Sequence, residues 1–322
     1  MQTNTAVVIP HYQTRPGVLA RTLAAVMAQE DAPEFEVIIV DDESPAPAIG
    51  ELEGLDEAAR ARIRIVPRRN GGPAAAKNTG LAALPPEVEF VALLDCDDLW
   101  HPRHLARGMA AMERGYDLFF GDNRRENTEK SHFTMFGIDA TGHVPLDGLP
   151  VLYQWNTELF DACVRMPVVG LSTTIFRRAR FADLRFAEDV DFADDFWFAL
   201  DVAHRRPRIA VSFFEEAVYG VADNISVVTD WRSDKAQRVT LSIVLCYVKL
   251  LKTGWLNPDN EAFVRRRLRD ARRNFATTTL AILYRHHAIK WSYIRRFLVA
   301  DPWVTVSFVA VIMRSIFLRS RA

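Results

Sequence analysis

Three carboxylates follow a short apolar run at a spacing that suits a divalent cation. Residues 90–100 read FVALLDCDDLW, and they place Asp95, Asp97 and Asp98 after five apolar residues. The flanking prolines favour a buried strand over a buried helical turn. Carboxylates crowded at a strand end repel one another unless a cation neutralises them, and such oxygen ligands suit Mg²⁺ or Mn²⁺ shared with phosphates. The alternative is a solvated acidic turn in which Asp98 caps the helix from Pro102.

Two more polar clusters end strand-like segments nearer the N-terminus. They are Asp41-Asp42 and the stretch Arg68 to Gly72, which includes Asn70 and Gly71. Parallel sheets bring such ends to one edge, where open α/β folds bind ligands. The competing interpretations are an Asx turn at Asp41-Asp42 and an ordinary tight turn at the glycines.

A nucleoside diphosphate would explain all the clusters together. Asp42 could accept a hydrogen bond from the imide N–H of a base, and Asp95 could hold ribose hydroxyls. Asp97 could hold the metal on the diphosphate, with Cys96 between the two acids. Lys77, one helical turn beyond the glycines, could assist the phosphates, or it could simply be exposed.

The elements that must position these residues alternate strand with helix, which predicts an α/β fold with a mainly parallel sheet. Residues 124–170 are polar and weakly periodic, which indicates a long loop. Strands are expected at 6–10, 35–40, 63–67, 90–94, 116–120, 171–176 and 208–214, and helices at 15–28, 51–60, 74–84, 102–114, 192–205, 235–253, 259–287 and 289–299.

Charge divides the 322 residues into two regions. Residues 1–230 carry 22 Lys and Arg against 36 Asp and Glu, whereas residues 231–322 carry 18 against 5. The net charge of -1 therefore hides an acidic α/β domain, 1–230, and a basic helical extension, 231–322. The three scattered cysteines indicate a reducing compartment. No signal peptide opens the sequence and no apolar run is long enough to span a bilayer, so a cytoplasmic location is expected.

The motifs together resemble those of glycosyltransferase family 2, whose members have the Rossmann-like GT-A fold. VVIPHYQ is similar to the family's first strand, DDESP to its Asp-Asp-x-Ser turn, NGGPAAAKNTG to its Asn-Gly-Gly segment, and FVALLDCDDLW to its D-x-D strand. The resemblance covers about residues 5–230. It implies an inverting, metal-dependent transferase that moves one sugar from a UDP-, GDP- or dTDP-sugar to a glycan or lipid-linked acceptor in polysaccharide synthesis.

The resemblance also implies roles for individual residues. Pro10, Tyr12, Asp42, Asp95 and Asp97 would bind the nucleotide-sugar, with Asp97 on Mn²⁺ or Mg²⁺.

The general base would be an Asp at the start of a helix. Its counterpart here is Asp195, with Asp194 and Asp189 as alternatives, in a region that also holds Glu188 and Asp191. Asp194 stands where the family more often has Glu, and Tyr219 to Ser226 lacks a His that the family often carries.

The basic extension predicts an anionic partner. Arginines and aromatic residues alternate between 265 and 321, which suits peripheral contact with the inner face of the cytoplasmic membrane. The alternative is a helical arm packed on the acidic domain or on a second copy in a homo-oligomer. Nucleic acid is not expected, because no binding motif accompanies the charge.

Other functional classes are less compatible with the sequence. A processive synthase would carry a Gln-x-x-Arg-Trp signature, and a dehydrogenase would carry G-x-G-x-x-G after its first strand. A sugar nucleotidyltransferase would have a glycine-rich loop where residues 10–16 have none. A catalytically silent glycan- or lipid-binding protein on the same fold stays a second hypothesis.

Overall fold

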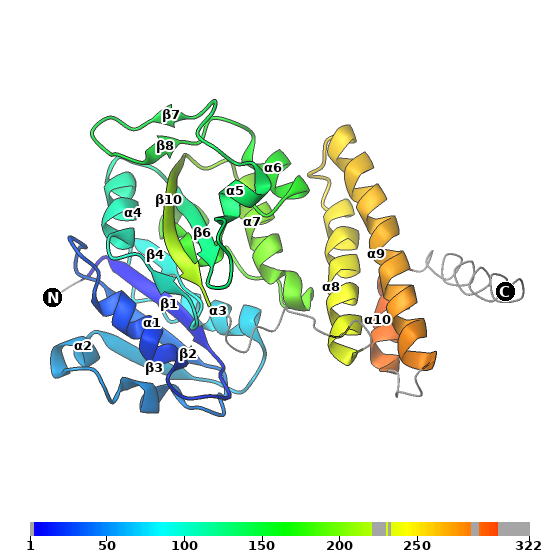
Figure 1. Ribbon diagram of the computed structural model, residues 1–322, viewed down its shortest axis with the longest axis horizontal. Coiled ribbons are helices and arrows are strands. Elements are labelled where there is room, and N and C mark those ends of the chain that lie inside the picture. Colours follow the sequence, from blue (N-terminus) through cyan, green and yellow to red (C-terminus); the bar gives the residue numbers. More distant parts are fainter. Residues whose placement is uncertain (1–2, 221–229, 231–232, 285–289, 302–322) are drawn as a thin grey trace, which may run out of the picture. The chain divides into compact units, whose positions relative to one another are not determined.

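A computed structural model describes residues 3–220, 230, 233–284 and 290–301. These residues form two compact units (Figure 1). The first unit contains the chain before residue 187 and continues from 198 to 220. The second contains residues 187–197 and the C-terminal helices. The acidic segment 187–197, expected in the α/β domain, thus groups with the basic extension.

Four parallel strands form the N-terminal part of the sheet, in the order β3-β2-β1-β4. They are β1 (Thr5–His11), β2 (Glu36–Asp41), β3 (Ile63–Pro67) and β4 (Phe90–Leu93). β1 and β4 are buried almost throughout, which explains their unbroken apolar sequences. Because all four strands run in one direction, the residues after β2, β3 and β4 reach the same edge.

Helices connect these strands close to the expected positions. They are α1 (Val18–Met27), the 3-10 helix η1 (Ala48–Leu52), α2 (Glu57–Ala61), α3 (Pro73–Ala82) and α4 (His104–Glu113). The Asn-Gly-Gly-Pro turn starts α3. Gly72 has a φ of 88°, which favours glycine, and Pro73 occupies the first turn, where no N–H partner is needed.

The remaining strands make the sheet mixed. It continues from β4 through β9, β6, β10 and β8 to β7, and β5 also pairs with β10. β6 (Leu118–Arg125) runs parallel to β10 (Ile209–Tyr219). β9 (Ile175–Arg177) lies antiparallel between β4 and β6, and β5 (Leu99–Trp100) is antiparallel to β10. The predicted α/β class with a mostly parallel sheet is confirmed, with antiparallel strands added.

The expectation of a long loop at 124–170 is wrong. This region contains α5 (His132–Phe136), β7 (Val144–Pro145), β8 (Leu152–Gln154) and α6 (Leu159–Arg165). β8 pairs with β10, so the region extends the sheet. Strands of two or three residues are too short to show a periodicity. Short 3-10 helices η2 (Leu171–Thr173) and η3 (Arg178–Phe181) flank β9.

The second unit is helical, as expected. It contains α8 (Asp234–Leu251), α9 (Pro258–Tyr284) and α10 (Trp291–Ala300), which pack through an apolar cluster centred on Phe275 and Phe297. It also contains η4 (Asp191–Ala193) and the first turn of α7 (Asp194–His204). The apolar segment 303–318 lies outside the described residues. Among the residues that are described, no helix combines the length and apolar character that a bilayer span requires.

Candidate active site

The D-x-D loop follows the fully buried strand β4. Asp95 and Asp97 are partly buried, whereas Asp98 is 4% exposed. The backbone N–H of Asp98 donates to the carbonyl of Asp95 over 3.1 Å, which closes a turn. The turn leaves the first two carboxylates at the carboxyl edge of the sheet and directs the third inward.

Asp98 anchors this loop. It accepts hydrogen bonds from the Ser172 hydroxyl at 2.5 Å and from the Gly220 N–H at 2.9 Å. The same hydroxyl accepts from the N–H of Asp95 at 3.0 Å. The alternative in which Asp98 caps the helix from Pro102 is wrong, because α4 begins after Arg103 and Asp98 bonds elsewhere.

The end of β10 lies directly against the D-x-D backbone. A Cβ atom on Gly220 would come within 2.1 Å of the carbonyl oxygen of Asp97. Any larger residue would therefore displace the loop. Tyr219, beside it, accepts a hydrogen bond on its hydroxyl from the Ser172 N–H at 3.2 Å.

The second and third clusters assemble around Asp42, which is 2% exposed. Its carboxylate accepts from Arg68 Nη1 at 2.6 Å and from the backbone N–H groups of Gly71 and Gly72 at 3.1 and 2.8 Å. The Asn70 side chain donates to the Asp42 carbonyl at 3.0 Å. Asp42, Arg68, Asn70 and Gly71, which the sequence singled out separately, thus form one hydrogen-bonded group.

Lys77 lies on α3, the helix that begins after Gly72, and its side chain reaches the D-x-D loop. Its Nζ lies 3.7 Å from Asp95 Oδ1 and 5.2 Å from the ring centre of Phe186. The side chain is 3% exposed, so the alternative of a simply exposed lysine is wrong. A buried cation beside a carboxylate edge is placed where it could meet a phosphate.

The remaining predicted site residues lie at the end of β1 and in the D-x-D loop. Pro10 lies in β1, and Tyr12, just beyond the strand, is 42% exposed. Cys96, by contrast, is 6% exposed in the apolar core. Its thiol accepts a hydrogen bond from Gln13 at 3.2 Å, and burial raises its pKa to about 12. The Cys96 side chain therefore faces the protein and stays a neutral thiol.

Asp95 and Asp97 are the carboxylates of this loop that could hold a divalent cation. Burial raises the pKa of the Asp98 carboxyl well above its ordinary value, and the charges of Asp95 and Asp97 raise it further. The raised pKa favours the neutral form of Asp98, so the negative charge of this turn rests on Asp95 and Asp97, and a cation would relieve it. Within the described chain, no group of three or more His, Cys, Asp and Glu side chains is arranged to hold a metal. The protein would supply one or two carboxylates, and phosphate oxygens would complete the shell.

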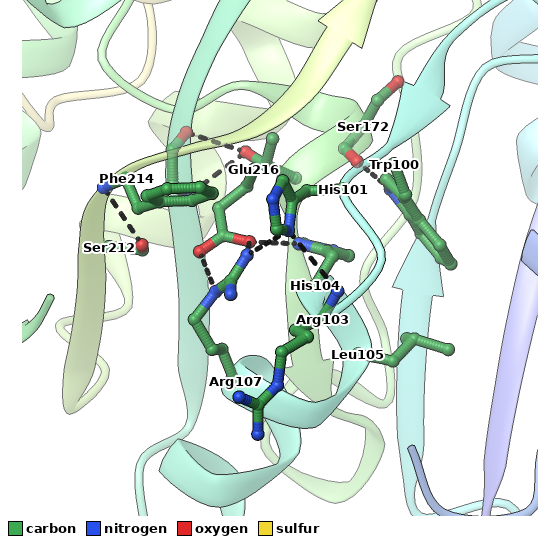
Figure 2. A network of polar contacts seen from close by, with 12 residues as sticks. Trp100, His101, Arg103, His104, Leu105, Arg107, Ser172, Ser212, Phe214 and Glu216 are labelled. Carbon is green, nitrogen blue, oxygen red and sulfur yellow. Dashed lines mark hydrogen bonds and ion pairs between the residues drawn. The ribbon is translucent and has the colours of Figure 1, made fainter. Parts of the chain in front are cut away.

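A buried ion-pair network holds the chain that follows the D-x-D loop (Figure 2). Glu216, fully buried on β10, accepts from Arg107 Nε and Nη2 at 2.7 and 2.8 Å. Nδ1 of the buried His104 lies 3.3 Å from Glu216 Oε2, and the His101 N–H donates to the Glu216 carbonyl at 2.8 Å. The network ties the start of α4 to β10.

The candidate base belongs to the second unit. Asp195 is exposed in the first turn of α7, whereas Asp194 is 4% exposed. Asp189, the other alternative, forms an ion pair with Lys249 at 2.5 Å. Asp195 is thus an exposed candidate that keeps the expected position at a helix start.

Sequence reasoning missed Ser172, Gly220 and Glu216. Ser172 stands in no motif that the sequence reveals. Gly220 did carry a signal, because a glycine at the end of an apolar strand often marks a place where another backbone segment comes close. Glu216 gave none, because its partners lie more than a hundred residues away.

Comparison with known proteins places these features in a family. The sequence model described as "Glycosyl transferase family 2" matches residues 6–157. The chain is 34% identical over 223 residues to the succinoglycan biosynthesis protein ExoW of Rhizobium meliloti (strain 1021), covering 68% of this chain and 69% of ExoW. It is 23% identical over 229 residues to the uncharacterized glycosyltransferase EpsJ of Bacillus subtilis (strain 168), covering 70% of this chain and 62% of EpsJ.

Solved structures share the fold. S. aureus TarS 1-349 in complex with UDP-GlcNAc aligns with a TM-score of 0.56 at 18% identity, covering 96% of this chain and 81% of that one. The mannosyltransferase PcManGT from Pyrobaculum calidifontis, in complex with GDP-Man and Mn²⁺, aligns with a TM-score of 0.57 at 18% identity, covering 97% and 87%.

Proposed function

Because the chain belongs to glycosyltransferase family 2, we propose that it moves one sugar from a nucleotide-sugar to an acceptor hydroxyl with inversion at C1. The observation that carries the proposal is the arrangement at one sheet edge. Asp95 and Asp97 end β4 there, beside Lys77 and the Asp42 group that ends β2 and β3.

The Asp42 group would hold the base. Its carboxylate already receives donors from Arg68 and Gly71, so a base imide would use a remaining lone pair or replace one of them. Asp95 would hold the ribose, and Lys77 the diphosphate. The backbone near Pro10 and Cys96 and the exposed ring of Tyr12 would border the nucleotide. UDP-, GDP- and dTDP-sugars all present these groups, and TarS and PcManGT were solved with UDP-GlcNAc and GDP-Man.

Asp97, with Asp95 as a second ligand, would bind Mn²⁺ or Mg²⁺. When bound, the ion supplies Lewis-acid stabilisation of the departing diphosphate. PcManGT was solved with Mn²⁺.

Asp195 would act as the general base. It would take the proton of the acceptor hydroxyl as that oxygen attacks C1 and the bond from C1 to the phosphate oxygen breaks. Asp195 fits this role better than Asp194, whose side chain is buried, or Asp189, which lies before α7 and not in its first turn.

The acceptor would be a glycan, lipid-linked or free, on the cytoplasmic side in the synthesis of a surface polysaccharide. The likeness to ExoW, a succinoglycan biosynthesis protein, supports this substrate class. The helices of the second unit would hold the enzyme at an anionic membrane surface. Trp291, Arg295, Leu298 and Val299 share one exposed face of α10, and Trp291 and Val299 are 72% and 74% exposed.

A thermal-shift panel of nucleotide-sugars with and without Mn²⁺, paired with a transfer assay, tests the proposal. Wild type should be stabilised by at least one nucleotide-sugar, more strongly with Mn²⁺. Asp97→Asn should lose the Mn²⁺-dependent part of the shift. Asp195→Asn should keep the full shift but lose about 100-fold or more in transfer rate.

Asp56→Asn serves as the control. It neutralises an acid far from the proposed site in sequence and keeps a side-chain oxygen that can cap α2, so it should behave as wild type in both assays. Absence of any nucleotide-dependent shift in wild type would contradict the proposal. Donor binding without transfer or donor hydrolysis would favour the silent binding protein instead, and release of pyrophosphate would favour a nucleotidyltransferase.

A further inference from the structure

The segment that carries the candidate base is held by the C-terminal helices through charge. We propose that Lys249 of α8 and Arg296 of α10 are positioning residues that hold residues 187–197 and so orient Asp195. The inference rests on the proposed function, because it assigns a purpose to the basic extension in the same transfer reaction. The term clamp denotes the four residues of these ion pairs, Lys249, Arg296, Asp189 and Asp191.

Ion pairs fix the segment just before α7. Lys249 Nζ lies 2.5 Å from Asp189 Oδ1, and Arg296 Nη1 lies 2.8 Å from Asp191 Oδ2. Arg296 also donates through Nη2 to the Asp189 carbonyl at 3.2 Å. A further arginine, Arg238, lies 3.5 Å from Asp191 Oδ1. Side chains from two helices therefore hold both acids and the backbone between them.

The backbone at Asp191 needs such support. Its φ of 44° lies in the left-handed region, which non-glycine residues adopt at an energetic cost. Strained conformations persist only where surrounding contacts enforce them, and they cluster at functional sites. The two arginines on the Asp191 carboxylate provide contacts of this kind.

Aromatic packing fixes the other side of Asp195. The Trp197 indole lies 5.7 Å from that of Trp255, and Lys249 Nζ lies 4.5 Å from the Trp197 ring centre. The Phe196 ring meets Tyr247 of α8 edge-on at 6.4 Å. Lys249 thus contacts the segment on both sides of Asp195, while Asp195 itself stays exposed.

This arrangement matches what a general base requires. Proton transfer needs the carboxylate within hydrogen-bond reach of the acceptor hydroxyl, and small misplacements of reacting groups lower rates strongly. Partly exposed ion pairs contribute little to global stability, so the clamp is better explained by orientation than by folding.

Steady-state kinetics of clamp variants of the full chain test the proposal. Arg296→Ala and Lys249→Ala should each lower kcat by about tenfold to a hundredfold. The KM for the donor and the donor-induced thermal shift should stay at wild-type values, since the donor residues lie in the first unit. The conservative variants Arg296→Lys and Lys249→Arg should recover much of kcat.

Glu261→Gln is the matched control. It removes an ion pair of the same helical unit, with Arg265 at 2.5 Å, that contacts neither the clamp nor the segment. Its kcat should equal that of wild type. An unchanged kcat in the double variant Lys249→Ala/Arg296→Ala would overturn the proposal, as would an equal loss in Glu261→Gln.

Hydrogen exchange provides a readout independent of activity. Amides of 188–197 should exchange faster in Arg296→Ala than in wild type or Glu261→Gln, whereas amides of β1 and β4 should not change. Unaltered exchange at 188–197 would overturn the clamp even if no acceptor were found. If the wild-type protein bound no nucleotide-sugar, the proposed function would be refuted. Faster exchange at 188–197 in Arg296→Ala would in that case still show that the clamp holds this segment.

Discussion

At the scale of single residues, burial separates acids that the protein encloses from acids that keep some exposure. Asp98 and Glu216 are buried and fully engaged by the protein, whereas Asp95, Asp97 and Asp195 keep some exposure. Burial raises the pKa of Glu216, but hydrogen bonds and charges from His104 and Arg107 outweigh it, so the pKa is lowered. Glu216 is therefore a charged group that holds α4 to β10.

Glu216→Gln should lower the free energy of unfolding by about 3 kcal/mol, because it leaves the Arg107 charge poorly compensated. Glu215→Gln removes the neighbouring, partly exposed pair with Arg124 and should cost less than about 1 kcal/mol. Urea denaturation at pH 7 compares them. Equal losses of unfolding free energy in the two variants would mean that the buried network stabilises the fold no more than the exposed pair does.

The same group sets a pH dependence. A lowered pKa in the folded state means that the contribution of Glu216 is complete above its unfolded value of about 4.3 and is lost as the pH falls through the lower folded value. The stability gap between wild type and Glu216→Gln should thus narrow below about pH 4. If this stability difference stayed constant down to the lowest accessible pH, Glu216 would not be ionised in the folded protein.

At the scale of elements, α3 approaches the sheet through a glycine. A Cβ atom on Gly80 would lie 2.4 Å from Val8 Cγ1 and 3.2 Å from Val40 Cγ2. This contact sets the distance of α3 from β1 and β2, and with it the position of Lys77 beside Asp95.

Gly80→Ala should therefore destabilise the protein by about 1–3 kcal/mol, because the added methyl overpacks a buried contact. Gly50→Ala, where a Cβ meets nothing within 4 Å, should be neutral or stabilising by about 0.5 kcal/mol. Thermal unfolding of both variants provides the measurement. Equal melting temperatures would show that α3 can shift without cost.

At the scale of the whole molecule, two classes of cation can be distinguished among the described residues of the basic extension. Arg238, Lys249, Arg272 and Arg296 pair with acids of the second unit. A second class, exposed on α9, comprises Arg266, Arg269 and Arg273, which share one helix face at spacings of three and four residues. These three arginines and Arg295 of α10 are among the described cations that a lipid surface could reach.

Wild-type protein should sediment with phosphatidylglycerol vesicles at low salt and dissociate as the salt concentration rises. Replacing Arg266, Arg269 and Arg273 together by Gln should weaken binding about 100-fold, at about 1 kcal/mol per residue. Phosphatidylcholine vesicles are the control and should bind weakly. Equal binding to both lipids, or no effect of the triple variant, would refute membrane contact through this face.

Local chemistry sufficed to predict most elements and the motifs at strand ends, although the strand expected at 171–176 begins with the 3-10 helix η2. Apolar runs and turn residues are local signals, so β3 appears at the expected residues. The Asp42 group and the D-x-D loop end parallel strands on either side of β1. The assignment of 124–170 to a loop failed because its strands are too short to show a period.

The contacts that orient the site required the folded chain. Ser172 and Asp98 are 74 residues apart, Gly220 and Asp98 are 122 apart, and Arg296 and Asp191 are 105 apart. Side-chain periodicity reports preferences within a few neighbouring residues and carries no information about which distant groups will meet. Residue types along the chain therefore indicated what chemistry could take place, whereas packing established which acids are buried, which are ion-paired with distant residues and which stay exposed.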